Sequence, residues 1–347
     1  MPAIVHARAR DGIRLAYHTV GAGPALVMLF PYHVNDLVLN WAVPAHRQAI
    51  RFLANYFTVI NLDLRGAGQS ERRVDELTLQ ALSDDVLTVL DDLGVRQSSV
   101  CAMGSSALVA AHLASVASER VARLALLGAV DSETSKRLFG LRVLNPAVGS
   151  DARASAVVGL GDPENTAALA AVIREALPSQ TFADYERLVA RSDVASLLER
   201  VETSTLVVHA SDDELLPLGA ARQLVARMPN AHLFVVTAPS TFAIWHDQLA
   251  VDGIVAFFEQ RWSGRPDDMP RRRPPAARWD PSPLGLTKRE QEVLRLVAHG
   301  RTNAEIGMEL FISLNTVSHH LRSIFAKTGS KNRTEAAAFA HRSGFLR

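Results

Sequence analysis

The sequence has a single cysteine and no long uninterrupted apolar run, and both absences restrict what the protein can be. Cys101 has no second cysteine for an intrachain disulfide and no partner thiolate for a structural zinc site. The first twelve residues contain no apolar segment of the kind a secretory signal needs. No run approaches the roughly 18 apolar residues of a membrane-spanning helix. We therefore expect a cytoplasmic protein that has no membrane contact and binds no metal or cofactor.

Net charge is also small, +1 over 347 residues, but it is distributed unevenly along the chain. From residue 284 to the end, ten lysines and arginines stand against five glutamates, which gives +5. Residues 263–283 add +2, so the first 262 residues carry −6. A basic C-terminal segment on an acidic body is typical of proteins that bind nucleic acid through that segment.

Length and composition predict two globular domains. A chain of 347 residues exceeds a typical single core, and 48% apolar with 21% charged residues excludes a disordered protein. We place the domains at 1–262 and 284–347, joined by an arginine- and proline-rich linker over 263–283. The simplest interpretation of Arg271-Arg272-Arg273 in this linker is a solvated spacer, and an accessory DNA contact is the alternative.

The C-terminal domain is predicted to consist of four helices. Two capping boxes, Thr287 to Glu290 and Thr302 to Glu305, predict the starts of the first two helices, and Gly300 ends the first. The third helix occupies 312–329, with Ser313 as N-cap and Gly329 as its stop, and the fourth begins at Arg333. A short helix, a tight turn and a longer helix form a helix-turn-helix arrangement.

The third helix has two chemically distinct faces. An apolar stripe at helical spacing predicts packing on the domain core, and it consists of Val317, Leu321, Ile324, Phe325 and Thr328. The other face carries donors, acceptors and a cation but no acid, and it consists of Asn315, Ser318, His319 and Arg322. That combination suits a groove lined with base edges and phosphates.

Three segments of this domain, LTKREQEVLRLVAHGRTNAEI, ISLNTVSHHLRSIFAKTGS and NRTEAAAFA, resemble the LuxR-type (GerE-like) DNA-binding family. The resemblance implies double-stranded DNA as partner, a homodimer and contact with RNA polymerase. One position departs from the family, because Ser318 stands where a lysine usually follows the Thr-Val pair. We expect Arg322 to read a base and the small-residue face of Ala336–Ala340 to form part of the dimer contact. The full set of expected DNA contacts is Thr302, Asn303, Asn315, Thr316, Ser318, His319, Arg322, Lys327, Lys331 and Arg333.

The N-terminal domain alternates apolar strands with helical patterns, which favours a doubly wound α/β sheet. Strands are predicted at 25–30, 57–62, 98–103, 121–127, 205–209 and 233–236, and helices at 41–55, 79–93, 106–117 and 246–261. Between about 131 and 200 the strand signal stops and helix-like sequence takes over. This interruption predicts a helical lid inserted in the sheet.

The same domain resembles the α/β-hydrolase fold over residues 13–262. Asp63 to Ser70, read DLRGAGQS, is similar to the family's D-x-R-G-x-G-x-S loop, and Asp213 with Pro217 is similar to its acid-bearing turn. The predicted fold class is therefore an α/β-hydrolase-like doubly wound sheet with a helical lid, followed by an all-α four-helix LuxR-type domain.

The resemblance also indicates where a catalytic triad would lie. A gapless reading places Gly104 at the nucleophile position and Thr241 at the base position, and leaves Asp213 as the acid. Without nucleophile and base, acyl transfer cannot begin, so we expect a non-enzyme. Two alternatives stay open: a one-residue slip makes Ser105 the nucleophile, with Met103 crowding the turn, and His246 acts as base.

We expect a hydrolase pocket that lacks its nucleophile and base to bind a small, largely apolar molecule as a receptor. The residues expected to line it are Tyr32, His33, Gly104, Ser105, Thr241, Phe242 and Trp245. The leading hypothesis is a ligand-responsive transcription regulator whose lid responds to the ligand. The alternatives are an active hydrolase that degrades its own inducer and a constitutive DNA-binding protein whose large domain only dimerises.

Overall fold

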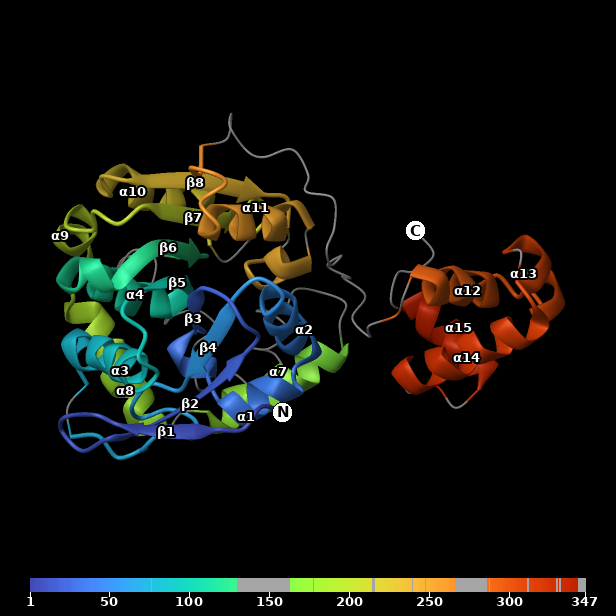
Figure 1. Ribbon diagram of the computed structural model, residues 1–347, viewed down its shortest axis with the longest axis horizontal. Coiled ribbons are helices and arrows are strands. Elements are labelled where there is room, and N and C mark those ends of the chain that lie inside the picture. Colours follow the sequence, from blue (N-terminus) through green and yellow to red (C-terminus); the bar gives the residue numbers. More distant parts are fainter. Residues whose placement is uncertain are drawn as a thin grey trace. The chain divides into compact units, whose positions relative to one another are not determined.

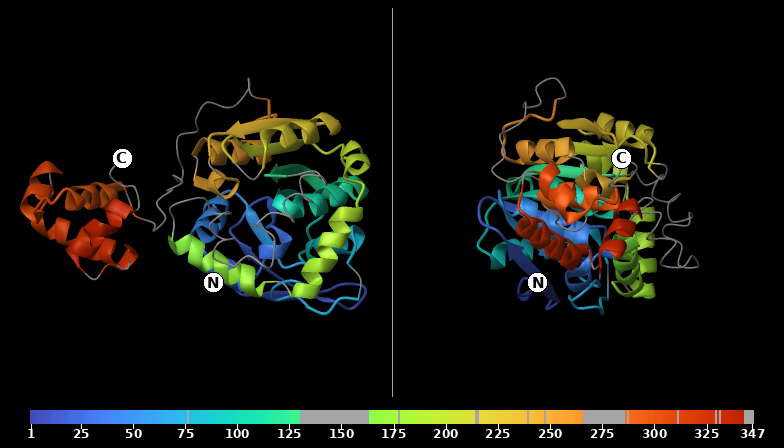
Figure 2. Two further views of the ribbon diagram at one scale, coloured as in Figure 1. Left: turned by 180° about the vertical axis from the view of Figure 1, so that it is seen from behind. Right: turned by 90° about the vertical axis from the view of Figure 1, so that its right-hand side faces the viewer.

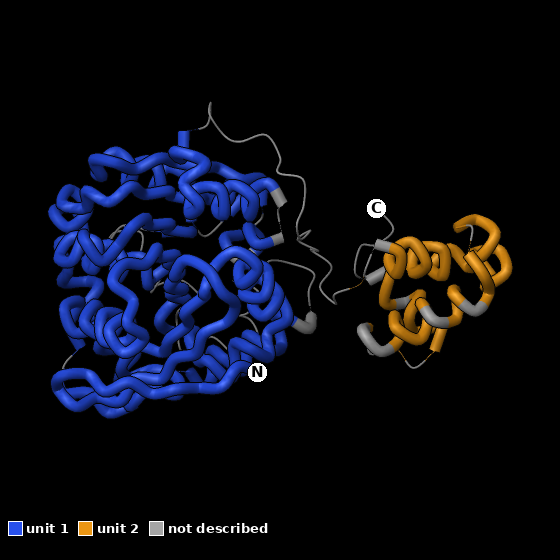
Figure 3. Tube along the Cα trace, viewed as in Figure 1, with its two compact units in different colours: residues 1–277 blue, residues 278–347 orange. Residues whose placement is uncertain are grey.

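The computed structural model describes residues 1–129 except 76, residues 163–265 except 177, 214, 215, 239 and 247, and residues 286–342 except 287, 311, 329 and 331. The chain divides into two compact units, residues 1–277 and 278–347 (Figure 3), and each is described by itself. Among the helices of the described residues, none has both the length and the hydropathy needed to cross a membrane.

Unit 1 contains an eight-stranded sheet with the order β1-β2-β4-β3-β5-β6-β7-β8 (Figure 1). The strands are β1 (Val5–Arg8), β2 (Arg14–Val20), β3 (Ala25–Leu29), β4 (Thr58–Leu62), β5 (Ser98–Met103), β6 (Val121–Leu127), β7 (Thr205–Ala210) and β8 (Ala231–Val236). All pairs from β4 to β8 are parallel, whereas β1–β2 and β2–β4 are antiparallel. The six strands predicted from apolar runs are confirmed. The β1–β2 hairpin at the sheet edge was not predicted.

Helices cover both faces of this sheet (Figures 1 and 2). On one face, side chains such as Leu29, Ala102 and Leu126 form a continuous core with α3 (Leu79–Asp92), α4 (Ala107–Val116), α9 (Val194–Glu199) and α10 (Leu218–Arg227). The opposite face is covered by α1 (Leu37–Ala42), α2 (Pro44–Leu53) and α11 (Gln248–Phe258). Burial on both faces explains why the central strands read as near-continuous apolar runs.

The predicted helix at 41–55 is two helices, α1 and α2. Val43 between them is extended, with φ −71° and ψ 115°, because the following Pro44 disfavours a helical conformation at the preceding residue. Pro44 itself is well placed at the first position of α2, where no backbone N–H is needed. The closing helix is likewise shorter than predicted, since a 3₁₀ turn at Phe242–His246 precedes α11.

The described part of the predicted lid consists of α7 (Pro163–Glu175), α8 (Ser179–Arg191) and α9. Residues 130–162 of the lid lie outside the described residues, as does most of the linker over 263–283. The structure therefore describes the lid mainly through α7 and α8.

Unit 2 consists of α12 (Lys288–Ala298), α13 (Asn303–Glu309), α14 (Leu314–Thr328) and α15 (Arg333–Arg342). The capping box at Thr302 is present, with the Glu305 backbone N–H donating to Thr302 and the Glu305 carboxylate accepting from the Thr302 backbone. Ser313 caps α14 by accepting from Thr316 N at 3.1 Å. Gly300 ends α12 with φ +78°, a conformation that favours glycine. Thr287 and Gly329, the other predicted boundary residues, lie outside the described residues.

The core of unit 2 confirms the apolar stripe on α14. Val317 and Ile324 are fully buried there and Leu321 is nearly so. The small-residue face of α15 was assigned wrongly, however, because Ala336 and Ala340 are also fully buried in the same core. Small side chains let α15 approach its neighbours within the domain, so these two alanines are not a free dimer surface.

Candidate functional site

The turn after β5 places Gly104 at the end of a central strand, where the chain enters the 3₁₀ turn Gly104–Ser106 and then α4. Gly104 has φ +52°, in the left-handed region that residues with a side chain rarely adopt. Among the described residues, a Cβ added there would come within 4 Å of Pro31 alone, at 3.4 and 3.7 Å. The turn thus has the sharp strand-to-helix geometry of a nucleophile elbow, and its central residue has no side chain.

Asp213 and Thr241 come together at the ends of β7 and β8. The Asp213 Oδ2 accepts hydrogen bonds from Thr241 N at 2.9 Å and from Thr241 Oγ1 at 3.2 Å, and its Oδ1 accepts from Leu216 N at 3.1 Å. Thr241 is nearly buried and packs tightly on Gly128, where an added Cβ would lie 2.2 Å from Thr241 Oγ1. Among the contacts of the described side chains, the acid thus accepts from a threonine hydroxyl at the position where the base of a triad is expected.

Ser105 and His33 form a second polar pair beside the elbow. Ser105 Oγ lies 3.3 Å from His33 Nδ1, and both side chains are half-buried. The adjacent Ser106 is different, because it is fully buried and its hydroxyl donates to the Phe30 carbonyl at 2.6 Å. Of the two serines after Gly104, only Ser105 lies against an imidazole.

Aromatic side chains from α8 cover this region. Tyr185 is fully buried, donates to the Ser105 carbonyl at 2.7 Å, and stacks on Tyr32 with ring centroids 4.5 Å apart. Phe182 lies edge-on to His33 at 6.3 Å. The lid therefore joins the elbow to the predicted pocket residues Tyr32 and His33. Sequence reasoning missed Phe182 and Tyr185, for which the only sign was their three-residue spacing on one helical face.

The remaining predicted pocket residues lie on the 3₁₀ turn after β8. Trp245 is 4% exposed, and its Nε1–H has no hydrogen-bond partner among the described residues. The side chains of Phe242 and His246 lie outside the described residues, so their roles as pocket wall and alternative base stay predictions. Trp245 follows Thr241 by four residues and is buried like it.

The loop from Asp63 to Ser70 has a structural role in this fold. The buried Asp63 carboxylate accepts from Gln69 N at 2.8 Å and Leu37 N at 3.2 Å. Burial raises the pKa of Asp63 to about 7, against the opposing effect of these two hydrogen bonds. Arg65 is held by the buried Asp85 carboxylate at 2.7 Å. The motif thus fastens the loop to α1 and α3.

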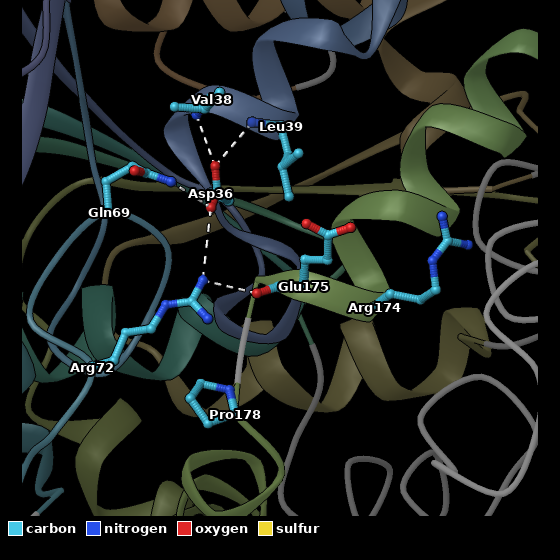
Figure 4. A pocket seen from close by; sticks show the side chains of 8 residues that line it. All are labelled: Asp36, Val38, Leu39, Gln69, Arg72, Arg174, Glu175 and Pro178. Carbon is cyan, nitrogen blue, oxygen red and sulfur yellow. Dashed lines mark hydrogen bonds and ion pairs between the residues drawn. The ribbon is translucent and has the colours of Figure 1, made fainter.

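A pocket of about 490 Å³ lies where this loop, α1 and the C-terminal end of α7 meet (Figure 4). Arg72 bridges the parts, because its Nη2 donates to the Glu175 carbonyl at 2.8 Å and lies 4.0 Å from the Asp36 carboxylate. The wall also includes Gln69, Arg174 and Pro178. None of the predicted ligand residues lines this pocket, and the sequence reasoning did not identify it.

In unit 2, α14 exposes part of the predicted DNA-reading face. Arg322 is exposed and Ser318 is half-buried, on the face opposite the buried Val317 and Leu321. The side chains of Asn315, His319 and Lys327 lie outside the described residues, and so does Lys331 altogether. For those four residues, DNA contact stays a prediction from sequence.

The predicted phosphate contacts near helix starts already have partners within the domain. Arg333 donates from Nη1 to the Asn303 side chain at 3.0 Å and from Nη2 to the Arg301 carbonyl. Thr316 Oγ1 lies 2.8 Å from the hydroxyl of Ser313, and Thr302 bonds Glu305. The Arg333 contacts hold α15 against the start of α13, whereas the threonine contacts are local to the starts of α13 and α14. DNA binding by Arg333 requires it to share its donors.

Comparisons with known proteins assign a family description to each part. Residues 284–340 match the family described as bacterial regulatory proteins, luxR family. The Bacillus subtilis transcriptional regulatory protein LiaR is 54% identical over 57 residues, which are 16% of this chain and 27% of LiaR. The chain thus spans about a quarter of the length of this relative. The C-terminal part is a LuxR-type helix-turn-helix domain.

Residues 38–153 match the alpha/beta hydrolase fold. A putative carbamate hydrolase RutD of Caulobacter sp. is 26% identical over 260 residues, covering 67% of this chain and 93% of that protein. The crystal structure of the enol-lactonase from Burkholderia xenovorans LB400 superposes with TM-score 0.62 at 20% identity, over 74% of this chain and all of the lactonase. Est816, described as an N-acyl homoserine lactone degrading enzyme, has TM-score 0.58 at 21% identity, over 70% of this chain and 95% of its own. The N-terminal part has the α/β-hydrolase fold.

Proposed function

We propose that this chain, which joins an α/β-hydrolase-fold domain to a LuxR-type helix-turn-helix domain, is a transcription regulator that binds a small, largely apolar molecule without hydrolysing it. Fold does not by itself assign function, so the proposal rests on the site. The regulator acts on double-stranded DNA as a homodimer in the cytoplasm, and its output includes contact with RNA polymerase.

The proposal rests on which residues occupy two positions of the hydrolase fold, the nucleophile position and the base position. The elbow residue Gly104 has left-handed geometry and no side-chain nucleophile, and Thr241 donates to Asp213 at the position where the family places the base. A Ser-His-acid triad needs the base to take the proton from the nucleophile. With both replaced, binding is the function left to the site.

The lid supports a receptor role. Helix α8 reaches the elbow through Tyr185 and packs on His33 through Phe182. A ligand entering above Gly104 meets these aromatic side chains, so its affinity depends on where α8 lies. Differential affinity for two lid positions is the requirement for a ligand to shift a conformational equilibrium.

The experiment that tests the proposal isolates the full-length protein under native conditions and identifies small molecules released from it on denaturation. We expect a stoichiometric apolar compound, or one found by screening, that raises the melting temperature and alters the affinity for operator DNA. Operator DNA protected over two half-sites is expected for a dimer. Stabilisation by a ligand with no effect on DNA binding would contradict the regulatory part of the proposal.

One observation favours a second function, an active hydrolase joined to a DNA-binding domain. Ser105 Oγ lies 3.3 Å from His33 Nδ1, a separation at the long end for a serine and its base. In this alternative Ser105 replaces the missing nucleophile from the next position. Ser105 stands one position beyond the elbow residue Gly104, and its carbonyl is already bonded by Tyr185 of the lid. We therefore favour the receptor.

A further inference from the structure

A second surface on unit 1 gathers positive charge on a domain that is acidic elsewhere. Arg8, Arg14, Arg72 and Arg73 line a depression of about 550 Å³ at the edge of the sheet. The first 262 residues carry −6 overall, so this concentration of arginines runs against the charge of its own domain. A concave surface with one sign of charge raises the local concentration of counter-ions.

Backbone pairing fixes the arginines close to one another. Arg8 and Arg14 are direct partners across the antiparallel β1–β2 pair, an arrangement in which like charges destabilise a sheet. The loop that bears Arg72 and Arg73 is tied to β2, because Glu71 N donates to the Arg14 carbonyl at 2.8 Å and Ala16 N donates to Ser70 Oγ at 2.8 Å. Backbone hydrogen bonds thus hold the segments that bear the four arginines beside one another.

Acidic side chains offset only part of this positive charge. Asp11 pairs with Arg65 at 2.6 Å. Glu71 also lines the depression and keeps its negative charge, although it accepts from the backbone N–H of Arg14 at 3.3 Å, so the lining holds four arginines against one carboxylate. Within the described ranges, none of Arg8, Arg14 and Arg73 forms an ion pair. Their guanidinium groups are exposed and offer the planar forks that suit phosphate and carboxylate oxygens.

We propose that this depression is a second effector site, which binds a small molecule carrying two or more phosphate-type anionic groups. The volume lies in the range of small-molecule sites, and several fixed cations require several anionic groups to satisfy them. A long polyanion such as DNA fits less well, since beyond the depression it would run over an acidic domain. This site is separate in chemistry from the apolar pocket at Gly104 and does not depend on it.

Arg72 connects this site to the lid. The depression shares Arg72 and Gln69 with the pocket of Figure 4. The Arg72 guanidinium also holds the Glu175 carbonyl at the end of α7. An anion bound beside Arg72 competes with that carbonyl for the guanidinium, so occupancy of this site changes how firmly α7 is held.

The test uses inorganic tripolyphosphate as the probe and the full-length protein at low ionic strength. We expect saturable binding by calorimetry with a rise in melting temperature, and much weaker binding of orthophosphate. The double variant Arg14→Ala/Arg73→Ala should weaken binding at least tenfold. Arg222→Ala, an exposed arginine on α10, is the matched control and should leave binding unchanged.

Arg322→Ala separates this site from the DNA-reading face, because that variant should bind tripolyphosphate as the unaltered protein does. If the double alanine variant fails to fold by circular dichroism, Arg14→Gln/Arg73→Gln replaces it. Unchanged tripolyphosphate affinity in the folded double variant would overturn the proposal. Orthophosphate binding as tight as tripolyphosphate, or binding of random duplex DNA that the double variant loses, would overturn it too.

Discussion

Gly104 and Gly128 share nearly the same backbone conformation, with φ +52° and +55°, but their surroundings differ. Of the described residues, Pro31 alone comes within 4 Å of a Cβ added at Gly104, at 3.4 Å or beyond, whereas a Cβ added at Gly128 meets Thr241 Oγ1 at 2.2 Å. The backbone strain of adding a side chain is therefore matched at the two sites, and the packing cost is not. Comparing alanine variants at Gly104 and Gly128 therefore measures how much space the described residues leave at the elbow.

The first prediction compares Gly104→Ala with Gly128→Ala. We expect Gly104→Ala to lower the free energy of unfolding by about 1 kcal/mol, the usual cost of left-handed strain. Gly128→Ala should cost a further 1–3 kcal/mol or so, since it overpacks against Thr241. Urea unfolding of both variants measures the difference. Equal losses would mean that the space above Gly104 is filled.

A second prediction at this scale concerns Asp63. Its buried carboxyl has a pKa of about 7, above the value of 3.8 in the unfolded chain. Between those pH values the folded state holds a proton that the unfolded state has lost, so this group's contribution to stability falls as pH rises from about 4 to 7. The slope approaches roughly 1.4 kcal/mol per pH unit for one proton.

Asp63→Asn removes this titration and keeps an oxygen that accepts from Gln69 N and Leu37 N. The difference in unfolding free energy between the variant and the unaltered protein should therefore move in favour of the variant as pH rises from 4 to 7. Urea unfolding across that range measures it, and other titrating groups cancel in the difference. A pH-independent difference would rule out the raised pKa.

Some residue-level features could be predicted from sequence and others could not. Gly104 and Thr241 were identified through the resemblance to the α/β-hydrolase fold, with the apolar strand before each turn setting the register. The contact between Ser105 and His33 joins loops 72 residues apart and has no local signal. The arginine surface also escaped prediction, since it depends on the β1–β2 hairpin, whose short strands lack a continuous apolar pattern.

At the scale of elements, α8 is the part of the lid most closely joined to the site. Its Tyr185 hydroxyl donates to the Ser105 carbonyl, and its ring stacks on Tyr32. The hydrogen bond and the stacking are separable, because Tyr185→Phe removes only the first. An unsatisfied buried carbonyl costs about 1–3 kcal/mol, so the lid should open more often without it.

We therefore expect Tyr185→Phe to speed amide hydrogen exchange over Ser179–Arg191 and to leave exchange in α4 (Ala107–Val116) unchanged. Local opening of the lid raises exchange there alone, whereas global destabilisation would raise it everywhere. Mass spectrometry of peptides from both helices makes the comparison. Equal exchange in α8 of the variant and the unaltered protein would show that the hydroxyl does not hold the lid.

Helix α14 carries the corresponding prediction for DNA. Its apolar stripe was predicted from helical spacing alone, and its buried side directs Arg322 outward. Arg322→Ala should lose about 1–3 kcal/mol of discrimination at one base pair of each half-site, because arginine grips guanine bidentately. Binding titrations with operator and single-base variants measure this. An equal loss of affinity on operator and random DNA would mean that Arg322 contacts the backbone.

The face of α15 shows why an element-level pattern can mislead. A stripe of small residues predicts close helix contact, and that contact occurs, but with α12 of the same domain. Local sequence does not say which helix fills the other side, since tertiary packing decides it. We therefore expect the dimer contact to lie elsewhere on the chain.

At the scale of the whole molecule, the chain combines an output domain with an acidic α/β domain whose elbow carries glycine. The two fold classes follow from separate sequence signals, helical capping boxes in one and buried strands in the other. The proposed function depends on the combination, because a pocket that binds a ligand without turnover is useful only if a second domain responds to its occupancy. Binding without turnover is thus the central claim.

The measurement that tests it most directly is intact-protein mass spectrometry of the full-length chain during incubation with a short-chain p-nitrophenyl ester. The account predicts no protein-dependent release of p-nitrophenol above a buffer control and no change in protein mass. A burst of p-nitrophenol with one added acyl group, mapped by peptide sequencing to Ser105 or Ser106, would contradict it and establish the hydrolase instead.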